Sequence, residues 1–336
     1  MFSGVAFALL SGICNGLFSA PMKLEKKWKW ENTWFGFILV ACLLMPVGMV
    51  IAGRLDVFSV YRSSPSPALA AALLFGFLWG FGAICFGRSV ERLGVSVANT
   101  LVIGLSSALG SLVPLILSKT FKLGPKEAVL LCGIAVFLIG VVISGKGGSL
   151  RDAHAVSSSD SPGNKVGLGY LFAIGSGVMS AIFNIGYALA LPISDAGVAL
   201  GNSRFASTNC IWLLMLGAGA IPNVVYCLFL MRRNRTLQFL ASAHVARSWM
   251  LSAAMGLLWG GSIFLYGAAT PRLGDLGPSV GWPLSLAVGL IVANMMGFLL
   301  GEWKQAPKLS VSYMRSGLIL LLLAIVLCGY SARMTA

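Results

Sequence analysis

The sequence contains few charged residues. Asp, Glu, Lys and Arg make up only 10% of its 336 residues, whereas a soluble domain has about 25%. Hydrophobic residues account for 57% of the chain, and the mean hydropathy is +0.88. This composition excludes an ordinary soluble domain and indicates an integral membrane protein.

Chemically reactive side chains are also scarce. The chain has 10 acidic residues, two histidines, and seven cysteines without a Cys-x-x-Cys pair. We therefore expect no metal site and no disulfide framework. We find no glycine-rich phosphate motif, so ATP as an energy source and a bound cofactor are not expected. An integral membrane enzyme would need clustered acids, histidines or a serine beside a base. None is visible, and we predict that the protein is not an enzyme.

The apolar residues are gathered into runs of roughly 20, the length that crosses a hydrocarbon core. Backbone groups in lipid must be satisfied within the chain, and these runs lack the alternating polarity of barrel strands, so we predict helices. The predicted fold class is an all-α integral membrane protein with ten transmembrane helices. The expected spans are 3–21, 34–52, 68–87, 94–117, 127–145, 167–192, 208–231, 249–268, 277–301 and 315–332.

The chain contains an internal repeat. Trp79–Gly94 aligns without a gap with Trp259–Gly274, and the segment around Ser11-Gly12 aligns with the segment around Ser176-Gly177. Each half holds five spans, and an odd number of crossings inverts the second half in the membrane. The sequence predicts two inverted five-helix repeats, 1–145 and 167–336, joined by a flexible linker at 146–166. Inverted repeats are typical of alternating-access transporters.

The net charge of +14 is spread over loops rather than gathered in a basic domain, so nucleic acid is not an expected partner. With the N-terminus outside, about two thirds of the 24 lysines and arginines fall in inner loops, as they do in membrane proteins generally. We predict a multi-pass protein of a bacterial-type inner membrane with both termini outside. The first span is expected to be an uncleaved helix, because four lysines follow it and none precedes it.

Polar and aromatic residues inside the spans are candidates for a substrate cavity. Intramembrane polar groups tend to face a cavity. Asparagine amides can donate to and accept from sugar hydroxyls, and a tryptophan face packs on a sugar ring. The candidate substrate-binding residues are Asn15, Trp79, Asn99, Asn184, Trp259 and Trp282. For each asparagine an interhelical hydrogen bond is the alternative, and for each tryptophan it is helix packing.

No acidic residue lies in the middle of a span, although proton-coupled carriers commonly use a desolvated carboxylate. The nearest candidates for proton coupling are Glu302 and Asp275, at opposite ends of the ninth span. Lys304 lies close to Glu302 in the sequence, so a surface ion pair is the alternative role for Glu302.

Several segments together resemble the L-rhamnose–proton symporter family, within the drug/metabolite transporter superfamily. They are Ala20–Lys23, Lys26–Glu31 with Trp34, Phe75-Gly76, Trp79-Gly80, Gly82, Phe86-Gly87, Arg92–Gly94, Ser96, Gly260, Tyr266-Gly267 and Gly301–Lys304. The resemblance covers nearly the whole chain. It implies ten helices in two inverted halves and sugar uptake driven by an ion gradient.

We therefore expect a secondary transporter that imports a monosaccharide, L-rhamnose or a related sugar, together with a proton. The expected partners are the sugar, the proton and the lipid bilayer. A carrier or exporter of another small polar solute is the alternative within transport. A membrane sensor without transport is a further alternative, but it would explain neither the inverted repeat nor the asparagines expected near the midplane.

Overall fold

The computed structural model describes residues 2–93, 95–117, 124–156, 164–242, 245–274, 277–299 and 301–334. In these ranges the regular structure is helical and contains no strand. The long helices are α6 (Ser66–Leu93), α7 (Val95–Leu117), α8 (Pro125–Val156), α9 (Asn164–Ala199), α10 (Arg204–Arg233), α11 (Ala246–Ala269), α12 (Gly277–Leu299) and α13 (Lys308–Arg333).

The first two predicted spans are built from shorter helices. The first consists of α1 (Phe2–Leu17) and α2 (Ala20–Leu24), and the second of α3 (Trp30–Ile38), a π-helical segment (Leu39–Leu44) and α4 (Met45–Ala52). Pro46 lies in the first turn of α4 and has no N–H to bond to the preceding turn, which explains a wider π-helical turn just before it. The short helices α5 (Val57–Ser63), η2 (Leu237–Ala241) and η3 (Thr270–Leu273) lie in connections.

Nine helical segments of the described residues are long and apolar enough to cross a membrane. They match nine of the ten predicted spans and confirm an all-α, multi-pass membrane protein. The remaining predicted span, 94–117, corresponds to α7, within which Thr100–Ile116 is a shorter apolar helix.

The predicted flexible linker at 146–166 is largely helical. Helix α8 continues to Val156, and α9 begins at Asn164, so only residues 157–163 lie outside the described part of the chain. The glycine and serine content suggested a flexible chain, but the first part of this segment extends a helix that packs along α13. Ser310 of α13 donates a hydrogen bond to the carbonyl oxygen of Gly147 on α8, at 2.5 Å.

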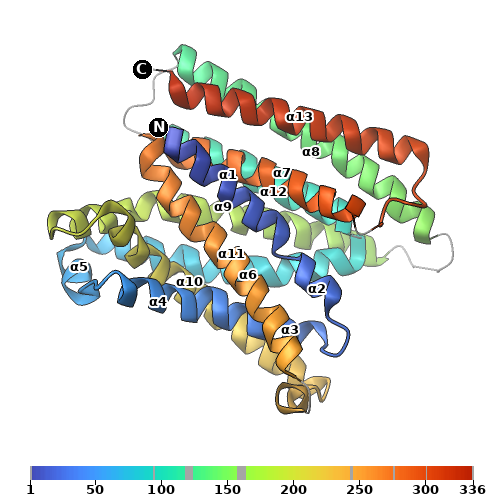
Figure 1. The fold of residues 1–336 in the computed structure, drawn as a ribbon, viewed down its shortest axis with the longest axis horizontal. Helices are drawn as coiled ribbons and strands as arrows, with labels where there is room; N and C mark the ends of the chain where they lie inside the picture. The colour runs from blue at the N-terminus through green and yellow to red at the C-terminus, as the bar shows by residue number, and fades with distance from the viewer. Residues whose placement is uncertain are drawn as a thin grey trace.

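Helices of each half pack against helices of the other half. Helix α6 packs on α9 and α10, and the repeat-related helix α11 packs on α1 and α3. Helix α7 packs on α9, and its counterpart α12 packs on α1. Figure 1 shows α8 and α13, the predicted fifth and tenth spans, side by side along one edge of the molecule. The center of the fold is therefore formed by helices α1, α6, α7, α9, α11 and α12.

Two equivalent contacts link the halves. The guanidinium of Arg92 lies over the ring of Phe172, 5.2 Å from its centroid, and that of Arg272 lies over the ring of Phe7, at 5.0 Å. The repeat alignment pairs Arg92 with Arg272 and Phe7 with Phe172. Each cation–π contact therefore joins an arginine of one half to a phenylalanine of the other.

Candidate substrate cavity

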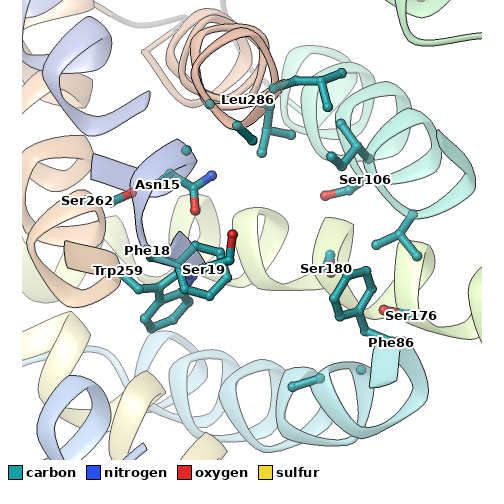
Figure 2. A pocket seen from close by; sticks show the side chains of 18 of the residues that line it. Asn15, Phe18, Ser19, Phe86, Ser106, Ser176, Ser180, Trp259, Ser262 and Leu286 are labelled. Carbon is teal, nitrogen blue, oxygen red and sulfur yellow. The ribbon is translucent and has the colours of Figure 1, made fainter. Parts of the chain in front are cut away.

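A cavity of about 860 Å³ lies among the central helices. Its walls come from α1, α3, α6, α7, α9, α11 and α12, with smaller contributions from α8, α10 and α13. Figure 2 shows side chains of both halves directed into this space. The volume falls within the usual range of small-molecule sites, roughly 300–1,000 Å³.

Two candidate tryptophans meet in the cavity wall. Trp79 of α6 and Trp259 of α11 stack with ring centroids 5.1 Å apart and planes 13° apart. Phe183 packs against Trp79 at 5.0 Å, and Phe37 meets Trp259 edge-on at 5.8 Å. The repeat alignment pairs the two tryptophans, so their contact joins the halves at equivalent positions. Together these rings form a continuous aromatic surface beside the cavity.

The other candidate tryptophan has its polar atom engaged by the protein. Trp282 lines the cavity from α12, and its indole N–H donates to the carbonyl oxygen of Ser106 on α7, at 3.1 Å. The ring thus forms part of the cavity wall, with 9% of the residue exposed, whereas the N–H already has a partner.

Asn184 does not line the cavity. Its side chain is completely buried, and its amide nitrogen donates to the carbonyl oxygens of Gly110 at 2.7 Å and Pro278 at 3.2 Å. Its amide oxygen accepts a hydrogen bond from the hydroxyl of Tyr266. The residue thus ties α9 to α7, α11 and α12. This corresponds to the interhelical alternative rather than to substrate contact.

Asn15 of α1 lines the cavity, and Figure 2 shows its side chain directed into this space. The side chain of Asn99 and the whole of Asp275 lie outside the described part of the structure. Thr100, the residue after Asn99, lines the cavity from α7.

Serine hydroxyls, which were not predicted from the sequence, also line the cavity. Ser11 donates to the carbonyl oxygen of Ser262 at 2.9 Å, and its hydroxyl lies 2.8 Å from that of Ser285. Ser106, Ser176 and Ser180 add hydroxyls from α7 and α9. The Ser106 hydroxyl is buried and makes no hydrogen bond within the described structure. The internal repeat could have indicated two of these serines, because it aligns Ser11 with Ser176.

Charged side chains line one end of the cavity. They are Glu31, Arg88, Arg151 and Glu302. Arg151 donates to Glu302 Oε2 at 3.3 Å, and its guanidinium lies 4.7 Å from the ring centroid of Trp303. Glu302 therefore lies in the cavity wall and forms an ion pair with an arginine.

The lysine- and tryptophan-rich segment at 26–31 lies at this same end. Trp28 packs edge-on against Trp249 at 5.0 Å and donates to the carbonyl oxygen of Phe239. Trp30 stacks on Trp34 at 5.2 Å, and both rings line the cavity. The tryptophans are thus packed inside, while Lys26, Lys27 and Lys29 are exposed.

Comparison with known proteins gives a family match over nearly the whole chain. A model of the L-rhamnose-proton symport protein family matches residues 1–334. The L-rhamnose-proton symporter of Yersinia pestis (strain Pestoides F) is 29% identical over 334 residues, which cover 97% of this chain and 96% of that protein. The L-rhamnose-proton symporter of Cronobacter sakazakii (strain ATCC BAA-894) is 27% identical over 336 residues, with the same coverage.

A solved protein crystal structure has a similar fold. It gives a TM-score of 0.62 and covers 99% of this chain and 98% of its own at 14% identity, so the likeness concerns the fold alone. The family match confirms the resemblance seen in the sequence and the prediction of a transporter rather than an enzyme. The chain belongs to the L-rhamnose-proton symport protein family.

Proposed function

We propose that this protein imports L-rhamnose or a closely related monosaccharide together with a proton, by alternating access, across a bacterial-type inner membrane. The observation that carries this proposal is the cavity between the halves, which combines stacked tryptophans with hydroxyl and amide groups. Aromatic faces pack on the C–H face of a sugar ring, and hydroxyl and amide groups can both donate to and accept from sugar hydroxyls. The substrate-binding set is Asn15, Trp79, Trp259 and Trp282, now with Ser11, Ser106 and Ser285.

The proposed architecture is ten transmembrane helices in two inverted five-helix repeats, 1–145 and 167–336. The packing of α6 on α9 and of α11 on α1, in which each helix contacts one from the other half, supports it. The two equivalent cation–π contacts between the halves, of Arg92 with Phe172 and of Arg272 with Phe7, also support it. A two-fold relation between the halves predicts such pairs of contacts, whereas unrelated helices would have no reason to repeat them.

The cavity is proposed to face the cytoplasm. Its charged end lies beside the loops that hold most of the lysines and arginines, which are expected inside. The opposite end is covered by the hydrogen bonds of Asn184 and Tyr266 to each other and to the carbonyl oxygens of Gly110 and Pro278. A sugar in this conformation would exchange with the cytoplasm and be separated from the outside by this layer.

A sugar panel tests the proposed substrate. We expect L-rhamnose to raise the unfolding temperature of the detergent-purified protein, since a ligand that binds only the folded state stabilises it by about 2.7 kcal/mol at 100 times its Kd. Sugars of different hydroxyl configuration should give smaller shifts. A shift produced only by a non-sugar solute would favour a carrier for another metabolite.

Cysteine labelling tests the orientation. In a cysteine-free background, Ser242→Cys in the connection before α11 should react with an impermeant maleimide only after the membrane is permeabilised. Ser63→Cys, at the end of α5, should react in intact cells. Both positions are exposed in the structure, so burial within the protein would not prevent the maleimide from reacting at either one. The reverse pattern would place both termini inside and the cavity open to the outside.

A further inference from the structure

Two carboxylates of the described chain line the cavity, and they differ in their surroundings. The Glu302 side chain is 32% exposed and is paired with Arg151. Glu31, in the first turn of α3, is only 5% exposed. Glu31 follows three exposed lysines in the sequence and was not among the predicted proton-coupling residues, yet the fold buries its side chain.

Glu31 is held by neutral donors. Its Oε1 atom accepts from the amide nitrogen of Asn234 and from the hydroxyl of Thr236, each at 2.9 Å. Asn234 caps the C-terminus of α10, and Thr236 follows in the turn toward η2. No ion pair to Glu31 and no hydrogen bond to its Oε2 atom is present among the described residues. The Oε1 atom is therefore held by two hydrogen bonds, whereas Oε2 has none and remains available to the cavity that Glu31 lines.

The charged and titratable groups around Glu31 come from three directions. Arg88 of α6 lines the same cavity, with its guanidinium 5.9 Å from the Tyr226 ring centroid. Cys227 of α10 is a titratable group near Glu31. The basic residues just before α3 and at or just after the end of α10 are exposed; they are Lys29, Arg232, Arg233 and Arg235.

This geometry suits both protonation states of a carboxyl. In the charged form, Oε1 accepts the two hydrogen bonds and Oε2 faces the cavity. In the protonated form, Oε1 can keep the same two bonds as a carbonyl oxygen while Oε2 carries the proton. Protonating Glu302, in contrast, would remove the charge that pairs with Arg151.

We propose that Glu31 is the carboxyl group that carries the co-transported proton. Its Oε2 atom binds one proton during inward movement and releases it to the cytoplasmic side of the cavity. This proposal rests on the proposed function, because it names the proton site of that same sugar cavity. An alternative role for Glu31 is purely structural, as a tie between α3 and the turn after α10.

The chain offers a matched control for the structural role. Asn32, the next residue, donates to the carbonyl oxygen of Thr236 at 2.9 Å and so ties α3 to the same turn without a carboxyl group. If accumulation depended only on how firmly this turn is held, Asn32→Ala would impair it at least as much as Glu31→Gln. Glu31→Gln itself keeps an oxygen that can accept from Asn234 and Thr236, but it cannot exchange a proton.

The test uses the full chain in proteoliposomes, with labelled L-rhamnose and a pH-sensitive dye inside. We expect Glu31→Gln to lose gradient-driven accumulation and sugar-dependent proton uptake, while sugar counterflow without a gradient stays within about threefold of wild type. Glu302→Gln, Asn32→Ala and the carboxyl-keeping Glu31→Asp should all retain accumulation.

Accumulation by Glu31→Gln at the wild-type level would overturn the assignment and leave the proposed function intact. Loss of accumulation in both Asn32→Ala and Glu31→Asp would also overturn it, because it would assign Glu31 to the structure of the turn. Wild-type protein that moves sugar without protons would overturn the proposed proton symport together with this assignment.

Discussion

Replacing Trp259 with alanine should lower the affinity for L-rhamnose by about tenfold, which corresponds to about 1.4 kcal/mol. The ring of Trp259 lines the cavity and stacks on Trp79, so its loss removes one aromatic surface and leaves the other without support. Aromatic contacts of this kind contribute roughly 0.5–1.5 kcal/mol beyond the burial of area. Titration of the purified protein by calorimetry would measure the change in Kd.

Leu257→Ala is the matched control, since Leu257 lies on the same helix with 57% of its surface exposed. It should bind sugar like the wild type. Trp259→Phe should recover part of the affinity, because it keeps an aromatic face. Wild-type affinity in a folded Trp259→Ala variant would remove the stacked pair from the proposed site.

Much of the fold could be predicted because the bilayer imposes a strong pattern. Long apolar runs predicted all-α structure, and nine of the ten expected spans correspond to membrane-length helices. The helical continuation of α8 to Val156 could not be predicted from local composition. Gly147 and Gly148 disfavour a helix in isolation, but packing of α8 along α13 outweighs that preference.

The site was harder to predict than the fold, because position in a span does not reveal which way a side chain points. The repeat identified Trp79 and Trp259 and the structure brings them together. Asn184 satisfied the same criteria but turns toward backbone carbonyls of neighbouring helices. Glu31 was not predicted because it lies before the expected span 34–52, although long-range contacts with Asn234 and Thr236 bury it.

Replacing Asn184 with alanine should open the outer side of the protein more often. The change leaves two backbone carbonyls and the Tyr266 hydroxyl without the partner they have now, and each buried unsatisfied group costs about 1–3 kcal/mol. Each 1.4 kcal/mol shifts a conformational equilibrium tenfold. The measurement is the rate at which an impermeant maleimide, added outside, labels Ser111→Cys in a cysteine-free background. Ser111 is completely buried beside Gly110, so we expect labelling at least tenfold faster in the Asn184→Ala variant.

Tyr266→Phe provides a graded comparison, because it removes one of the three hydrogen bonds and leaves the two from Asn184 to the carbonyl oxygens. Its labelling rate should lie between those of the wild type and Asn184→Ala. Both variants should still show a thermal shift with L-rhamnose, since neither side chain contributes a polar atom to the proposed sugar contacts. If Asn184→Ala abolished sugar binding without changing the labelling rate, Asn184 would be a substrate ligand after all. Faster labelling with binding preserved would instead establish the Asn184 hydrogen bonds as the closure between the sugar cavity and the outside.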